Sequence, residues 1–122
     1  LVIDNVPVLV SYIGTDLRYR FVNIAYERWF GRRRDEVVGR TMDEVLGPAA
    51  VERLKPFIAA VLSGEPVTFE REVPYRDGGT RFVHGSYVPH VAANGTIEGF
   101  VVLVADNTNL KRAAEEREQL LR

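Results

Sequence analysis

The sequence predicts an α+β fold, in which a five-stranded antiparallel sheet carries helices on one face and continues into a C-terminal exit helix. In the second half, strand-like stretches are joined by Asp77-Gly78-Gly79 and by Asn94-Gly95, which are typical hairpin turns. In the first half, the helical stretches are too short to be stable alone and must pack on something larger. The tight hairpins exclude a parallel βαβ array, so we expect the helices on one face of an antiparallel sheet.

Capping residues and glycines divide the first half into short elements. Its predicted elements are, in order, strands over 8–14 and 19–23 and helices over 24–30, 34–38 and 41–46. We expect Asn23 to cap the first of these helices and Gly31 to end it. Thr41 and Glu44 have the spacing of a capping box, which predicts the start of the third helix.

The second half begins with the longest internal helix. The predicted elements are a helix over 49–62 and strands over 67–75, 81–91 and 96–105. Pro48 suits the first turn of the helix, whereas Pro56 removes an internal hydrogen bond and should bend or divide it. The last strand is apolar at both parities from Phe100 to Val104, which predicts burial of both its faces. We expect residues 1–6, a partner chain or both to cover its outer face.

Composition excludes several classes of function. The chain has 122 residues and a net charge of −1, which provides no basic surface for nucleic acid. Its apolar runs are far shorter than the ~18 residues of a membrane helix, so we expect no membrane insertion of this segment and a cytoplasmic location. It has no cysteine, which excludes disulfides and zinc fingers. His84 and His90 lie roughly 20 Å apart along one strand, so no metal site is predicted.

Several separated motifs resemble those of PAS sensor domains. They are Asn23 with Phe30-Gly31, Glu36 to Arg40, Ser63 to Glu70, Asp77 to Pro89, and Asp106-Asn107-Thr108. Phe82 stands where tryptophan is common in the family. Asp106 and Thr108 match the Asp-x-Thr element that joins the last strand to the output helix. The resemblance covers almost the whole chain and implies a sensory or dimerising module with no catalytic residues of its own.

The resemblance also bears on cofactors. Flavin-binding light sensors of this superfamily carry a photoreactive cysteine where this chain has Met42, and a glutamine where the last strand has Val104. Haem-binding relatives carry a histidine on the long helix, and 49–62 contains none. Flavin and haem are therefore disfavoured, and a small apolar ligand or none is expected. Helix and strand periods predict the pocket lining: Leu54, Ile58, Phe69, Phe100, Val102 and Val104.

The C-terminal segment is predicted to carry the signal. Residues 1–108 would form the PAS domain, and 109–122 would start a signalling helix with an apolar stripe that begins at Leu110. We expect Asp106 and Thr108 to cap this helix, so these two residues and Leu110 are the predicted relay. The start inside an apolar segment and the end inside a helical pattern suggest a longer parent protein.

Three classes of function remain open. The first is a PAS sensor module, in a homodimer, that controls an effector domain of the same chain; a sensor histidine kinase is the favoured parent. The second is a ligand-free dimerisation scaffold in a diguanylate cyclase or a transcription regulator. The third, an α+β enzyme, is disfavoured because we find no nucleophile–base pair, metal cluster or phosphate loop. A connected internal cavity would favour the sensor, and a filled interior the scaffold.

Overall fold

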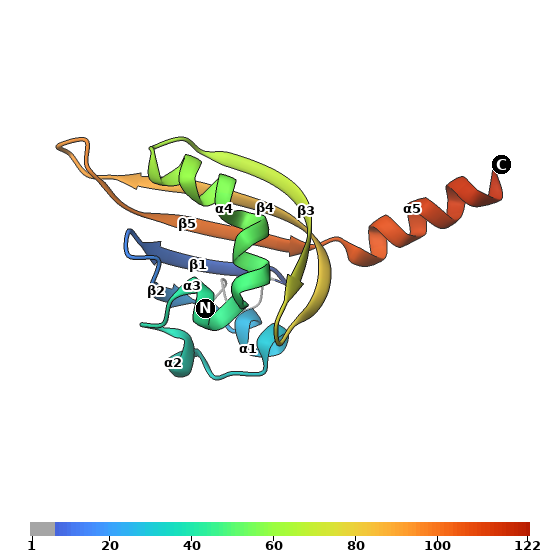
Figure 1. Cartoon of the computed structure of the whole chain (residues 1–122), viewed down its shortest axis with the longest axis horizontal. Helices are drawn as coiled ribbons and strands as arrows, with labels where there is room; N and C mark the ends of the chain where they lie inside the picture. Colours follow the sequence, from blue (N-terminus) through green and yellow to red (C-terminus); the bar gives the residue numbers. More distant parts are fainter. Residues whose placement is uncertain (1–6) are drawn as a thin grey trace.

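The computed structural model describes residues 7–122, which form the predicted α+β fold with five strands and five helices. In chain order these are β1 (Leu9–Gly14), β2 (Tyr19–Val22), α1 (Ala25–Phe30), α2 (Arg34–Val37), α3 (Met42–Leu46), α4 (Pro48–Leu62), β3 (Val67–Tyr75), β4 (Gly79–Val91), β5 (Ile97–Asp106) and α5 (Thr108–Leu120). Figure 1 shows α5 projecting from the end of β5, away from the sheet and the other helices.

The strands form one antiparallel sheet in the order β2-β1-β5-β4-β3. The two predicted hairpins are confirmed, and Gly79 and Gly95 supply positive φ angles of 74° and 87° at these turns. The first and last strands lie side by side, with Leu9 opposite Val104 and Ile13 opposite Phe100. This pairing places the first and last strands next to each other in the middle of the sheet.

Helix α4 packs its apolar face on the sheet and is not divided. Val51, Leu54 and Ile58 are buried, whereas Pro56 is exposed on the opposite side of an unbroken helical segment. Pro56 therefore does not divide the helix, and of the two predicted effects only a bend is left. Because its ring points to solvent, it takes no room in the core, and the buried face compensates for the missing hydrogen bond. Pro48 occupies the first turn, as predicted.

Asn23 does not cap α1, which corrects the sequence-based expectation. Ile24 is the residue before the helix, and no side chain caps its first turn. The Asn23 side chain is fully buried and bonds to β1 and the residue before it: Nδ2 donates to the Val8 carbonyl at 2.8 Å, and Oδ1 accepts from the Val10 N–H at 3.0 Å. Asn23 therefore holds the connection between β2 and α1 against the first strand.

The outer face of the sheet stays open within the described residues. Val101 and Leu103 of β5 are 36% and 44% exposed, so the predicted two-sided burial of this strand is not met by residues 7–122. Their cross-strand neighbours add apolar surface. We call this group the outer-sheet patch: Val10, Tyr12, Phe21, Val88, Val101 and Leu103. Residues 1–6, one of the predicted covers, lie outside the described residues.

Candidate functional site

A cavity of about 20 Å³ lies in the core among α1, α3, α4 and the inner face of the sheet. Four of the six predicted pocket residues line it: Leu54, Phe69, Val102 and Val104. Ile58 and Phe100 are buried in the same core but do not border the cavity. The lining residues that the sequence prediction missed are Leu9, Ile13, Tyr19, Tyr26, Met42, Leu46, Tyr75 and Tyr87.

The missed tyrosines make the cavity less apolar than expected. Tyr75 has the same strand parity as the correctly predicted Phe69, so period-two alternation along β3 could have found it. Tyr19 and Tyr26 come from β2 and α1, and only the tertiary fold brings these elements against α4 and β5. Aromatic contacts join the group, since Tyr87 packs edge-on against Phe69 and Tyr19 against Tyr26, with ring centroids 5.1 and 5.5 Å apart.

Three hydroxyl groups of this core form a hydrogen-bonded chain. The Tyr26 hydroxyl donates to Oγ of Ser11 at 2.9 Å, and the Tyr19 hydroxyl bonds to Tyr26. Burial raises the pKa of Tyr26 to about 12 and that of Tyr19 well above its ordinary value. All these hydroxyls are therefore neutral at physiological pH.

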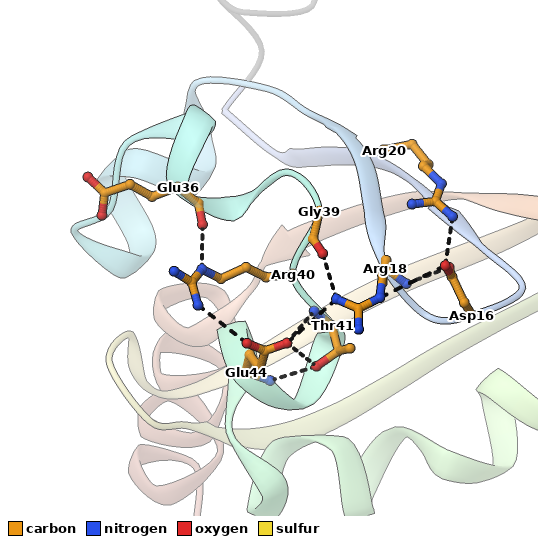
Figure 2. Close-up of polar contacts among 8 residues, drawn as sticks. All are labelled: Asp16, Arg18, Arg20, Glu36, Gly39, Arg40, Thr41 and Glu44. Carbon is orange, nitrogen blue, oxygen red and sulfur yellow. Dashed lines mark hydrogen bonds and ion pairs between the residues drawn. The ribbon is translucent and has the colours of Figure 1, made fainter.

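Polar contacts between residues 17–19 and residues 39–44 hold α3 in place beside the cavity. We call these contacts the strap. Helix α3 carries Met42 and Leu46 into the cavity lining, and its predicted capping box is present: Thr41 Oγ1 accepts from the Glu44 N–H, and Glu44 accepts from the Thr41 N–H. Figure 2 shows Arg18 and Arg40 on either side of this box, where Arg18 donates to the Gly39 carbonyl at 2.8 Å. Backbone hydrogen bonds between residues 17–19 and 39–42 complete the strap.

The second candidate site is the joint between β5 and α5. Oδ1 of Asp106 accepts from the Thr108 N–H at 2.9 Å, so the predicted cap by Asp106 is confirmed. Thr108 does not cap the helix, and that expectation was wrong. Its hydroxyl instead accepts from the Phe82 N–H of β4 at 2.9 Å, next to a bond from the Asn107 N–H to the Phe82 carbonyl. Both contacts attach the start of α5 to β4.

Arg81 adds a link from this joint toward the cavity. It donates to Oδ2 of Asp106 at 2.8 Å and to the Gly78 carbonyl at 2.9 Å. Its guanidinium lies 4.3 Å from the ring centroid of Trp29, which in turn packs edge-on against Tyr75. Trp29 is partly buried against the core. The contacts thus run from a cavity residue to the start of the exit helix.

The charge of Asp106 is constant near neutral pH. Partial burial by itself would raise the pKa of this carboxyl, but hydrogen bonds from Thr108 and Arg81 outweigh it and hold the pKa below its ordinary value. The stabilisation by the carboxylate is therefore complete above the unfolded-state pKa of about 3.9 and is lost only as the pH falls through the lower folded value.

The exit helix itself contacts little of the domain. All its side chains beyond residue 108 are exposed, and Leu110, the third predicted relay residue, is 69% exposed. Two ion pairs at i, i+4 spacing lie along it, Lys111 with Glu115 and Glu118 with Arg122. Lys111 also lies 4.2 Å from the ring centroid of Phe82. The position of α5 is therefore set by the joint and by contacts close to it.

Two features are absent from residues 7–122. No group of three or more His, Asp or Glu side chains in this range is arranged to hold a metal ion. None of the helices in this part of the chain has the length and apolarity needed to span a membrane.

Comparison with known proteins agrees with this architecture. A PAS domain from Colwellia psychrerythraea superposes with a TM-score of 0.73 at 19% identity, over 88% of this chain and 92% of that one. The PAS domain of Bordetella pertussis BvgS gives 0.70 at 25% identity, over 97% and 92%. The PAS domain of the histidine kinase ThkA gives 0.63 at 20%, over 81% and 98%.

Sequence comparison reaches the same family. No curated protein matches the chain. The family model described as PAS fold matches residues 3–112, which is most of the sequence. This chain therefore belongs to the PAS-fold family.

Proposed function

We propose that this PAS domain is the sensory and dimerisation module of a cytoplasmic, multidomain signalling protein, and that it controls an effector in the same chain through α5. The observation that carries the proposal is the joint at Asp106 and Thr108. Helix α5 is exposed, and the joint fastens its first turn to β4 next to Arg81. A change in the core that moves β4 or Trp29 is thereby transmitted to the helix, and it biases two arrangements of the effector.

A sensor histidine kinase is the favoured parent. ThkA, a histidine kinase, has a PAS domain of the same fold. Transmission of the signal through α5 also suits a dimeric kinase, because two exit helices that continue in parallel would form a coiled coil. A diguanylate cyclase or a transcription regulator would use the same joint.

The small cavity supports a second candidate, a dimerisation scaffold that binds no ligand. A volume of about 20 Å³ accommodates one or two water molecules, so side chains already fill most of the space between α4 and the sheet. The sensor and the scaffold differ in whether the remaining space is used, and a substitution that fills it separates them.

Val102→Ile is expected to weaken the stimulus response of the full-length protein several-fold while leaving the domain folded. The added methyl group enters the cavity, because Val102 is buried and lines it. The matched control is Val38→Ile, which adds the same group at an exposed position after α2, outside the sheet. Effector activity with and without stimulus is the measurement. An unchanged response in Val102→Ile, with equal or higher thermal stability, would favour the scaffold.

The proposed homodimer uses the outer-sheet patch. Apolar surface of this extent on a sheet face is typical of an interaction site, and a symmetric contact would bury it on both copies. The exit helices would then leave the two domains side by side.

Val101→Asp is expected to weaken dimerisation by at least about a hundredfold. The twofold axis places a buried, unpaired charge on each copy, and each charge should raise the dissociation constant about tenfold. Val38→Asp is the matched control. Val38 is 44% exposed and follows α2 outside the sheet, so this variant should remain dimeric. Sedimentation equilibrium measures both constants. A monomeric wild type at high concentration, or equal constants for the two variants, would contradict the interface.

A further inference from the structure

The polar groups around the core cavity indicate what kind of molecule it can hold. Its lining contains no charged side chain, and its apolar residues include Leu54, Val102 and Val104. An ion that entered would lose its hydration without gaining a counter-charge, which is far more costly than burial of a neutral molecule. The lining therefore selects against charged ligands of either sign.

Two lining hydroxyls, those of Tyr75 and Tyr87, take part in none of the hydrogen bonds found within residues 7–122, and Tyr87 is the more buried of the two residues. Every fully enclosed polar side-chain atom within residues 7–122 is hydrogen-bonded, and the Ser11, Tyr19 and Tyr26 hydroxyls satisfy one another. The Tyr87 hydroxyl takes part in none of the hydrogen bonds found in this range, although Tyr87 is only 2% exposed. Its oxygen must therefore border open space, and the cavity is the space that this side chain lines.

We propose that the cavity binds a small neutral molecule with a hydrogen-bond acceptor, to which the Tyr87 hydroxyl donates. In the unliganded protein a water molecule takes this place, since the volume of about 20 Å³ is enough for one or two. Burial raises the pKa of Tyr87 well above its ordinary value, so the hydroxyl keeps its proton and remains a donor across the physiological range. This inference rests on the proposed sensor function, because it names the chemistry of that pocket.

Room for a larger molecule comes from Met42. The strap fixes the backbone on either side of this residue: the Met42 N–H donates to the Leu17 carbonyl at 2.9 Å, and the Tyr19 N–H to the Arg40 carbonyl at 2.9 Å. The backbone around Met42 is therefore held in place and cannot move away from the cavity. The unbranched Met42 side chain, by contrast, changes rotamer at little cost, and its movement enlarges the cavity from the α3 side.

The test uses three probes of similar size. Cyclopentanone is neutral and has an acceptor, methylenecyclopentane is its isosteric hydrocarbon, and cyclopentanecarboxylate is the anion. Binding is followed by NMR through the methyl signals of Leu54, Val102 and Val104. Each titration is run on the wild type and on Met42→Ala, which opens the cavity, and then on each of these backgrounds with Tyr87→Phe.

We expect cyclopentanone to shift these signals saturably, and its affinity to fall about tenfold in Tyr87→Phe, as for the loss of one hydrogen bond. The affinity for methylenecyclopentane should stay the same or rise, and the carboxylate should not bind. If Tyr87→Phe leaves cyclopentanone binding unchanged, or if the carboxylate binds best, the proposed ligand class is wrong. The cavity would still be a binding site for a small molecule. If no probe shifts the signals even in Met42→Ala, the pocket itself, and with it the proposed sensor function, is overturned.

Discussion

Replacing Asp106 and Thr108 together by alanine is expected to abolish stimulus-dependent control of the effector while the core of the domain stays folded. The variant removes the side-chain hydrogen bonds of the joint: the bonds of Asp106 to Arg81 and to the Thr108 N–H, and the bond of Thr108 to the Phe82 N–H. Beyond the joint, α5 has no buried side chain that would hold its position.

The energetic scale explains why so small a change should have so large an effect. Hydrogen bonds with a charged partner contribute about 1.5–3 kcal/mol each, and neutral ones about 1 kcal/mol. A change in the core that weakens one of them shifts the equilibrium between two helix positions by about ten- to a hundredfold. Without these bonds, the helix keeps only the Asn107 and Lys111 contacts with Phe82, and its link to Arg81 and Trp29 is lost.

The measurement is effector activity of the full-length protein with and without stimulus, together with thermal unfolding of the isolated domain. Asp43→Ala with Thr96→Ala is the matched control, since both residues are exposed and lie away from the joint. The control should keep its regulation. Intact regulation in the joint variant would show that the signal leaves the domain by another route.

Asn23→Ala is expected to lower the free energy of unfolding by about 3 kcal/mol, the largest single-residue effect on stability that we expect. The substitution leaves the Val8 carbonyl and the Val10 N–H without their side-chain partner in a partly buried region. An unsatisfied backbone group costs about 1–3 kcal/mol, and the Asn23 side chain that satisfies both groups is fully buried.

Asn94→Ala provides the comparison, because Asn94 accepts a similar hydrogen bond from the Thr96 N–H in an exposed turn. Water replaces that bond, so a loss of less than about 1 kcal/mol is expected. Urea denaturation of both variants gives the two values. Equal losses would mean that the Asn23 contacts to β1 contribute no more than a surface turn.

The fold was predictable because its signals are local. The Asp77-Gly78-Gly79 and Asn94-Gly95 turns fix the pairing of β3 with β4 and of β4 with β5, and the Thr41–Glu44 capping box marks the start of α3. All these features act over a few residues. The same holds for the cap that Asp106 provides two residues before Thr108.

The errors arose where a side chain bonds across the fold. Asn23 and Thr108 have the residue type and position of helix caps, but each bonds instead to a neighbouring strand, Asn23 to Val10 and Thr108 to Phe82. Local hydrogen bonding and tertiary hydrogen bonding compete for the same side-chain oxygen. Sequence spacing identifies the candidate but not which of the two partners lies closer.

The cavity shows most clearly which features depend on local sequence patterns and which depend on tertiary contacts. Period-two and helical patterns in the sequence determined that Leu54, Phe69, Val102 and Val104 face one core, because each pattern reports the buried side of its own element. Only the tertiary structure decided that Tyr26 from α1 and Tyr87 from β4 both line this cavity, and that the Tyr26 hydroxyl bonds to Ser11. The reason is that a cavity is the space left between elements, and its polarity depends on how their side chains meet.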